Sequence, residues 1–520
     1  MANTINPRVK VVDFGPSLKL EGRQSSMEIT SDEFVYGASR ITYKDMSAID
    51  ELFKAKTDEK DITEKMKSAL IKSAGSGHAS MATTPGMWVV FEGDTSKFVD
   101  SIFTTARFGS SLMPSGRRVP ISKENILVPR AIAEAGEEAT KIYMRVSEQN
   151  IDAYGTLQQR GVPKEEAAKI VQYGHRGGGF AFMPLETLIY FSREIEHDNG
   201  CIPEEGKEIV RQLEDFVKSN GMGVVYEARK AAPRTGCPNP SVFHDRENLA
   251  HELADKFYNS LIPQIKISKD NDSSICSPAL QERILEYESK KKEVFETKSA
   301  FGWKFLLRRI EEIVADFNNT INILSYANTP WRVWGEVKRH RTLSQTAESV
   351  YHAVDRATEI LRKGENLEFA VSLPDSVARD SENIGLWRKC FSDSIAAYNE
   401  LVSMGINKSE AIAVIPRGLK LGVVKSFDLY NLTTGYISLR LCNTAEKEMR
   451  KITEQERDSI LSKDSRCAGL CGILVPKCGY VGFCPEEKFC GNIVKLRPNY
   501  TQEMHESFRK ERIDDIRAKI

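Results

Sequence analysis

Two stretches of the chain repeat one pattern of apolar and polar positions. Residues 153–167 read AYGTLQQRGVPKEEA and residues 397–411 read AYNELVSMGINKSEA. Both fit the pattern A-Y-x-x-L-x-x-x-G-[V/I]-x-K-x-E-A. Each copy predicts a helix that ends at a glycine, Gly161 or Gly405, and a second helix that begins with charged residues.

Two further pairs of segments repeat in the same order. Residues 88–107 (WVVFEGDTSKFVDSIFTTAR) align without gaps with residues 322–341 (NILSYANTPWRVWGEVKRHR). Each predicts an apolar strand, a polar turn and an amphipathic helix. A shorter pair, FVYGASR at 34–40 and VVYEAR at 224–229, opens each half. Together the three pairs predict a duplicated domain.

The duplication sets the predicted domain boundaries. We expect a mixed α/β (α+β) fold of two tandem domains, residues 1–220 and 221–460, each a central sheet with flanking helices. A charged stretch near residues 270–315, with apolar residues at helical spacing, is predicted to be a helical insert in the second domain. Residues 461–520 are predicted to form a cysteine-rich C-terminal extension.

The overall charge gives no reason to expect a polyanionic partner. The 520 residues include 73 Lys and Arg and 73 Asp and Glu, so the formal net charge is zero. Any anion site must therefore be local, and we expect neither nucleic acid nor a membrane as a partner. The N-terminal sequence lacks the apolar core of a signal peptide, and no run of about 18 apolar residues follows. These features predict a cytoplasmic protein.

Five cysteines crowd into the C-terminal extension: Cys467, Cys471, Cys478, Cys484 and Cys490. Structural zinc sites usually pair their ligands two to four residues apart on both sides, and only Cys467 and Cys471 show such spacing. Reduced, semi-buried thiols are therefore expected, with a metal site at these five residues as the alternative.

Arg339, His340 and Arg341 stand side by side at the end of a predicted helix. Consecutive helical residues point about 100° apart, so the three cannot all line one salt-bridged face. An imidazole between two guanidinium groups suits an extended anion, because arginine binds phosphate through two N–H groups. The hydroxyls of Ser344 and Ser349 add donors. The alternative is a solvated helix end whose basic residues are stabilised by the helix dipole.

This stretch, RHRTLSQTAESVY, resembles the signature of flavin-dependent thymidylate synthases, in which R-H-R is followed by seven residues, Ser, one residue and Arg. Downstream, GINKSEAIAVIP resembles that family's G-V-x-x-E-x-A-R-x-x-L-P segment. SLRLCNTAEKEMR resembles its R-x-x-x-x-A-Q-x-E-I-R element and keeps Arg440 and Arg450. In the first half, IYFSREIEHDNG places Arg193 where the second half has Arg440.

The first half resembles the same family with different losses. GHAS at residues 77–80 is similar to the family's G-H-x-S element. In TARFGSSLMPSGRR, residues 105–118, Thr105 and Ala106 replace the first Arg and the His. The signature positions that remain are Arg107, Ser110, Ser115 and Arg117. The chain therefore resembles two tandem, diverged copies of the flavin-dependent thymidylate synthase domain.

The resemblance implies an enzyme that methylates dUMP at C5 to give dTMP, with FAD as cofactor and methylenetetrahydrofolate and NADPH as co-substrates. The flavin carries the hydride, so no catalytic side chain is expected. The residues implied to bind the cofactor are Arg339, His340, Arg341, Ser344 and His78. The residues implied to bind the substrate are Ser115, Arg117, Arg107, Ser349, Arg440 and Arg450.

Departures from the family pattern divide between the halves. Tyr351 stands where the signature has its last Arg, and Ala168 and Ile412 stand where the family has a nucleotide-binding Arg. The first half keeps Ser-x-Arg and lacks Arg-His, whereas the second keeps Arg-His-Arg and lacks Ser-x-Arg. We therefore expect composite sites that draw on both halves, in a homodimer that forms a pseudo-tetramer.

Two other functions fit the same residues. One is a related flavoenzyme that modifies another pyrimidine nucleotide, because the phosphate and base contacts are altered. The other is a non-catalytic scaffold that binds a nucleotide or a flavin.

Overall fold

The computed structural model describes residues 3–21, 26–40, 50, 62–114, 121–233, 236, 238–267, 277–297, 302–463 and 465–520. The chain divides into two compact units. Unit 1 comprises Met1–Arg246 and Ser349–Leu419, and unit 2 comprises Glu247–Glu348 and Lys420–Ile520. Part of the predicted second domain thus belongs to the compact unit of the first. The predicted domain boundaries follow the sequence repeat and stay a prediction.

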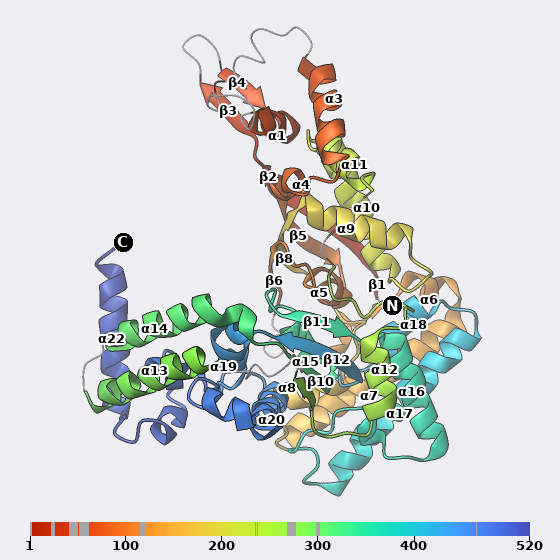
Figure 1. Cartoon of the computed structure of the whole chain (residues 1–520). Coiled ribbons are helices and arrows are strands. Elements are labelled where there is room, and N and C mark those ends of the chain that lie inside the picture. Colours follow the sequence, from red (N-terminus) through yellow and green to blue (C-terminus); the bar gives the residue numbers. More distant parts are fainter. Residues whose placement is uncertain are drawn as a thin grey trace. The chain divides into compact units, whose positions relative to one another are not determined.

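Unit 1 is built on a four-stranded antiparallel sheet (Figure 1). Its strand order is β2 (Asn6–Gly15), β5 (Gly86–Asp94), β8 (Gly179–Pro184) and β6 (Ser110–Leu112). In β5, Met87, Val89 and Phe91 are buried while Trp88 is exposed, which is the alternation of a strand with one covered face. Unit 1 also has two short two-stranded sheets: β1 (Asn3–Thr4) with β7 (Leu127–Val128), and β3 (Leu18–Glu21) with β4 (Ser26–Ile29).

Unit 2 repeats this arrangement. Its antiparallel sheet has the order β9 (Gln264–Ile267), β10 (Ile323–Pro330), β12 (Lys420–Phe427) and β11 (Ser344–Ala347). The gapless sequence alignment equates β5 with β10, and each is followed by a short helix, α5 (Phe98–Phe103) or α15 (Trp331–Val337). The predicted mixed α/β class, with one central sheet and flanking helices in each copy, is confirmed.

Helix α12 (Leu249–Phe257) covers one face of the unit 2 sheet. Ala250 and Ala254 pack there against Tyr326 and Val424. A Cβ atom on Gly422 of β12 would lie 3.0 Å from both the Ala250 carbonyl oxygen and the Ala254 Cβ. Glycine at this position therefore allows the helix to approach the strand closely.

The repeated A-Y pattern forms paired helices inside unit 1. Helices α7 (Glu137–Gln159) and α17 (Ser381–Ser403) each end just before a glycine with positive φ, 83° at Gly161 and 86° at Gly405. Short helices α8 (Lys164–Ala167) and α18 (Lys408–Ala411) follow. The predicted helix–glycine–helix pattern is confirmed. Across the pair, Asn150 Nδ2 donates to Ser394 Oγ at 3.0 Å.

The third sequence pair does not mark equivalent elements. Helix α1 (Ser31–Arg40) follows strand β2, whereas α11 (Gly223–Lys230) precedes strand β9. Between β9 and β10 lie α13 (Pro278–Glu296) and α14 (Gly302–Phe317), as α1 and α3 (Ile62–Ala74) lie between β2 and β5. In chain order, α13 and α14 therefore correspond to α1 and α3.

The remaining described helices are divided between the two units. In unit 1 they are α4 (Ser80–Thr83), α6 (Arg130–Glu134), α9 (Leu185–Glu196), α10 (Glu204–Ser219) and α16 (Val350–Lys363). In unit 2 they are α19 (Ile437–Arg440), α20 (Lys447–Lys463), α21 (Lys477–Val481) and α22 (Gln502–Arg517). Among the residues described, no helix has the length and apolar character needed to cross a membrane.

Candidate functional site

The Arg339–His340–Arg341 motif lies in a turn of unit 2, between α15 and β11. The prediction that it sits at a helix end was wrong, because α15 ends at Val337. Val337 and Leu343 are both buried, and the chain must turn between them to bring each into the core. Successive turns close through His340 N to Val337 O and Leu343 N to His340 O, each at 3.0 Å.

Both ring nitrogens of His340 are occupied. Its Nδ1 lies 2.9 Å from the Gly435 carbonyl oxygen, and Arg440 Nε donates to its Nε2 at 2.8 Å. Since a carbonyl oxygen only accepts and a guanidinium only donates, the ring is the neutral Nδ1–H tautomer. Burial, followed by the charge of Arg440, lowers the pKa of His340 to about 3.

Arg440 ties this histidine to α15. Its Nη1 forms an ion pair with Glu336 Oε2 at 2.6 Å, and its Nη2 donates to the Glu336 carbonyl oxygen at 3.2 Å. Three of the five guanidinium N–H groups are therefore used within the protein. The sequence predicts Arg440 to be a substrate ligand; in this structure its guanidinium holds His340 and Glu336.

A π-helix, Asn431–Gly435, clamps the motif from the other side. Asn431 Nδ2 donates to the Thr342 carbonyl oxygen, and the Thr342 hydroxyl donates to Asn431 Oδ1, both at 3.3 Å. A Cβ atom on Gly435 would lie 2.5 Å from the Tyr430 ring, so a larger residue here would have to displace that ring. Single π-turns inside helices often occur at functional sites, and here the turn directs the Gly435 carbonyl at His340.

The two arginines of the motif concentrate positive charge. Arg339 and Arg341 are both partly buried. Burial, then the nearby charge of Arg339, lowers the pKa of Arg341. Ser344 is exposed on the edge strand β11. Two neighbouring guanidinium groups are a donor set that suits a phosphate or pyrophosphate group.

A buried charge pair under the unit 2 sheet was missed in the sequence. Lys425 Nζ lies 2.5 Å from Glu456 Oε1, and both side chains are fully buried. Ser325 Oγ donates to the same carboxylate at 2.5 Å, and Lys425 Nζ donates to the Tyr436 hydroxyl at 3.2 Å. The only signal in the sequence is a second lysine, Lys425, in the interior of the otherwise largely apolar strand KLGVVKSF.

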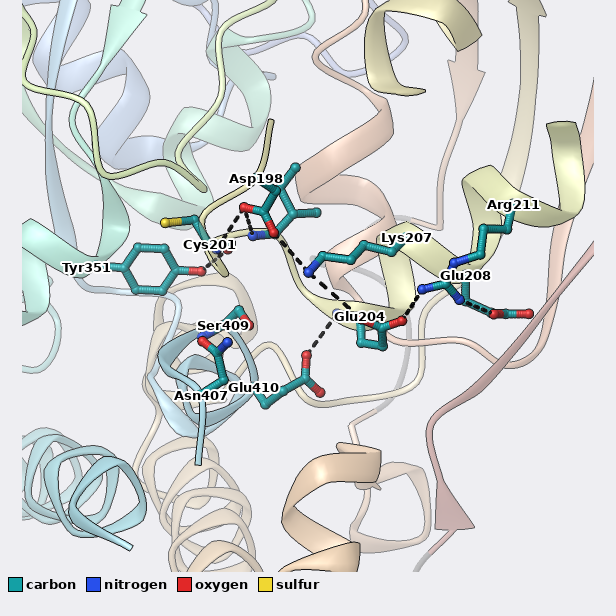
Figure 2. Close-up of polar contacts among 11 residues, drawn as sticks. Asp198, Cys201, Glu204, Lys207, Glu208, Arg211, Tyr351, Asn407, Ser409 and Glu410 are labelled. Atoms are coloured by element: carbon teal, nitrogen blue, oxygen red, sulfur yellow. Dashed lines mark hydrogen bonds and ion pairs between the residues drawn. The ribbon is translucent and has the colours of Figure 1, made fainter. Parts of the chain in front are cut away.

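In the second half, the remnant of Ser-x-Arg has become structural. Ser349 is buried and caps α16, its side chain accepting from the Tyr351 N–H at 3.3 Å. Tyr351 is buried as well, and its hydroxyl donates to the carbonyl oxygen of Cys201 (Figure 2). Neither side chain is placed to hold a ligand in this structure.

Polar contacts around Cys201 join the start of α10 to α18 within unit 1 (Figure 2). Asp198 Oδ1 accepts from the Cys201 N–H at 2.8 Å, and Lys207 lies 2.8 Å from Asp198 Oδ2. The Glu204 N–H donates to Glu410 Oε1 at 2.8 Å. Burial raises the pKa of Glu410. These contacts connect residues from the two halves of the sequence within unit 1.

In the first half, the equivalents of His340 and Arg440 are replaced or have other partners. Ala106 replaces His340 and is buried. Arg193, the equivalent of Arg440, donates instead to carbonyl oxygens at the C-terminal end of α11. These are Lys230 O at 2.6 and 3.0 Å, Arg229 O at 2.9 Å and Ala232 O at 2.8 Å. This arginine is therefore a helix cap.

The other predicted residues are dispersed. His78 is exposed after α3, and the Arg107 N–H donates to Asn239 Oδ1 at 3.0 Å. Arg450 Nη1 donates to Asn443 Oδ1 at 2.7 Å. Ser115 and Arg117 lie outside the described residues. Ala168 and Ile412, at the positions of the family's nucleotide-binding Arg, are fully buried in short 3-10 turns.

None of the five cysteines of the C-terminal extension forms a disulfide in the described part of the chain. Cys467, Cys478 and Cys484 are buried, whereas Cys471 and Cys490 are exposed. Burial raises the pKa of Cys478 to about 12. Within the described part of the chain, no three His, Cys, Asp or Glu side chains are grouped as metal ligands would be.

Residues 26–190 and 286–463 both match the family described as "Thymidylate synthase complementing protein". The chain belongs to this family. The two matched segments, one in each half, support the two-copy arrangement, and the resemblance stated from the sequence is confirmed.

Curated relatives carry the name flavin-dependent thymidylate synthase. The protein of Pyrococcus furiosus is 27% identical over 152 residues, 29% of this chain and 59% of the relative. That of Pyrococcus abyssi is 27% identical over 154 residues, 29% of this chain and 60% of the relative. The matched region thus spans about three fifths of these relatives' length.

Among solved structures, a UMP/dUMP methylase PolB from Streptomyces cacaoi bound with 5-Br dUMP is similar. It is 16% identical, the match covers 46% of this chain and 100% of that chain, and the TM-score is 0.36.

Proposed function

We propose that this protein methylates dUMP at C5, with FAD as cofactor, methylenetetrahydrofolate as carbon donor and NADPH as reductant. The observation that carries the proposal is the preorganised Arg339–His340–Arg341 turn, clamped by the π-helix and by Arg440. Membership of the family and the names of the curated relatives support it. The cytoplasmic location stays a prediction of the sequence.

The donor set fits a dinucleotide cofactor. Arg339 and Arg341 would hold the pyrophosphate, and their partial burial strengthens such contacts because the local dielectric is lower than that of water. The Ser344 hydroxyl on β11 would add a neutral donor. When bound, the flavin supplies the hydride chemistry that side chains cannot. The residues of the chain are then left to bind, to orient and to exclude water.

We further propose that the two copies divide the work. The second copy would supply the flavin contacts through Arg339 and Arg341, and the first would supply nucleotide contacts through Ser115 and Arg117. The structural roles of Arg193 and Tyr351 support this, since each occupies a position that the family uses differently. A homodimer forming a pseudo-tetramer would bring complete sites together.

Separate titrations of the two ligands test the proposal. Arg341→Ala should weaken FAD binding at least about tenfold, since a charged hydrogen bond is worth about 1.5–3 kcal/mol, while dUMP binding in the presence of saturating FAD persists. Arg117→Ala should show the opposite pattern. If Arg117→Ala leaves dUMP binding unchanged, the division of work is wrong.

A second candidate substrate is another pyrimidine nucleotide. Buried apolar side chains at Ala168 and Ile412, and the buried Tyr351, remove three arginine positions that the family uses. Release of tritium from C5-labelled dUMP, UMP and dCMP ranks the substrates directly. A purified protein that carries no flavin, and whose spectrum does not change with NADPH, would instead indicate a non-catalytic scaffold.

A further inference from the structure

We propose that Arg440 is a positioning residue that holds His340 as a neutral Nδ1–H imidazole. The positive charge of the R-H-R motif then comes from Arg339 and Arg341 alone. This inference deepens the proposed function, because it concerns the same site. In this state His340 cannot give a proton to a bound ligand. It also assigns a role to Arg440 that differs from substrate binding.

The hydrogen bonds around the ring carry the argument. Arg440 Nε points its N–H at the Nε2 lone pair at 2.8 Å, and the Gly435 carbonyl receives the Nδ1 proton at 2.9 Å. A proton added to Nε2 would have to displace the Arg440 N–H and would face its positive charge. Arg440 cannot simply turn away, because Glu336 holds its Nη1 and Nη2 at 2.6 and 3.2 Å.

The Tyr436 ring that packs against His340 is itself held by a buried ion pair. The Tyr436 ring packs edge-on against His340, with centroids 4.9 Å apart. The Tyr436 hydroxyl is held by Lys425 Nζ at 3.2 Å, and Lys425 is held by Glu456 at 2.5 Å. Lys425 also lies 5.3 Å from the centroid of the Tyr436 ring. A continuous set of contacts thus runs from β12 and α20 to the motif.

The charges that face His340 come from every element around it. Arg440 of α19 and Lys425 of β12 are cationic, and both disfavour the imidazolium. Glu336 of α15 is anionic, but its carboxylate is engaged with Arg440. Arg339 and Arg341 flank the ring in the chain. Burial disfavours the imidazolium most, and the positive balance of nearby charge disfavours it further, so the neutral ring is the stable form across the physiological pH range.

Nitrogen-15 NMR of the full chain labelled at histidine tests this without any ligand. His340 is assigned by the signal lost in His340→Gln. In the unsubstituted protein, the His340 signals should show the Nδ1–H tautomer and should not move between about pH 8 and about pH 5. In Arg440→Met, they should titrate with a midpoint that rises toward the usual value of about 6.5.

Matched variants separate positioning from folding. Arg440→Lys keeps a cation that can reach Nε2 and should preserve the neutral ring, while Arg457→Gln, on α20, should leave the His340 signals unchanged. If Arg440→Met does not fold, the tautomer of the unsubstituted protein still decides the question. An Nε2–H tautomer, or protonation of His340 near pH 6.5, would overturn the inference.

The outcome is independent of the proposed function. A neutral, locked His340 in a protein that binds no FAD would defeat only the proposed function. A normally titrating His340 in a protein that does bind FAD would defeat only this inference.

Discussion

The two copies use one equivalent arginine in different ways. In unit 2, Arg440 links His340 to Glu336 and shapes the turn that carries two further arginines. In unit 1, Arg193 caps helix α11 instead. The gapless alignment places Ala106 at the position of His340 and Ile102 at that of Glu336. Without those two partners, the arginine in unit 1 was free to take a structural role.

The side chains buried against the two sheets also differ between the copies. In unit 2, Ser325 of β10 and Lys425 of β12 share the carboxylate of Glu456. In unit 1, Phe91 stands at the position of Ser325 and stacks on Phe103, with ring centroids 5.2 Å apart. One copy is apolar where the other is ionic. A buried ion pair is weak evidence for stability, which favours a positioning role for the pair in unit 2.

Comparison of the copies teaches how a duplicated site diverges. At two positions of the family signature, the side chain has a packing or capping role in this structure. Arg193 caps a helix, and Tyr351 fills a buried site against the Cys201 carbonyl. At position 351, restoring an arginine would remove the buried hydrogen bond to the Cys201 carbonyl.

The largest expected effect is on the ionic layer. Lys425→Met leaves Glu456 buried without its partner and should lower the free energy of unfolding by about 3–5 kcal/mol. The double variant Lys425→Met/Glu456→Leu should recover most of that loss. Chemical denaturation of both variants, followed by a signal from unit 2, measures the two changes in the free energy of unfolding. Equal stability of Lys425→Met and the unsubstituted protein would contradict the importance of this pair.

Stability in unit 1 should depend on pH through Glu205. Its carboxylate accepts from the Ser96 N–H at 2.6 Å and from the Ser96 hydroxyl, and burial raises its pKa to about 7. The folded protein therefore keeps this proton up to about pH 7, while the unfolded chain loses it near pH 4.5. Stability should fall as pH rises through that window, by about 3 kcal/mol in total.

Glu205→Gln cannot ionise, so it should lack this fall. Denaturant midpoints of both proteins at about pH 5 and about pH 8 give the comparison. An equal change with pH in the two proteins would show that Glu205 is ionised in the folded state throughout.

Arg193→Ala should lower the free energy of unfolding by about 2 kcal/mol, since several buried carbonyl oxygens at the end of α11 lose their charged donor. Flavin content per folded chain should not change. Arg440→Ala should instead reduce flavin content. A loss of flavin in Arg193→Ala as large as that in Arg440→Ala would show that the copies still work alike.

The smallest effect is expected at Tyr351. Tyr351→Phe keeps the buried ring and loses the hydrogen bond to the Cys201 carbonyl, which should cost about 1 kcal/mol. Nucleotide binding should be unaffected, as measured by titration. Reduced nucleotide binding in this variant would give the hydroxyl a role in the site.

Local patterns predicted much of this fold. The helix–glycine–helix repeats were correct because the glycines at positions 161 and 405 supply positive φ where each helix ends. The strand predicted before each short helix was also correct, because its apolar positions are contiguous in the sequence. The pair at residues 34–40 and 224–229 failed because six or seven similar residues without a cap or turn carry little structural information.

The site depended on contacts that the sequence cannot show. The neutral state of His340 depends on Gly435 and Arg440, which lie 95 and 100 residues away. The role of Arg193 depends on the end of a helix 36 to 39 residues further along the chain. Signature residues identified the family, but their protonation and partners came from the fold.

Flavin content of two matched variants tests the central claim most directly. Arg341 and Arg107 occupy equivalent positions in the two copies. Arg341→Ala and Arg107→Ala can be purified in parallel and their bound flavin measured from the visible absorbance per folded chain. If the second copy holds the flavin, Arg341→Ala should lose its flavin while Arg107→Ala retains it. Loss of flavin in Arg107→Ala with retention in Arg341→Ala would contradict the assignment of the flavin contacts to the second copy.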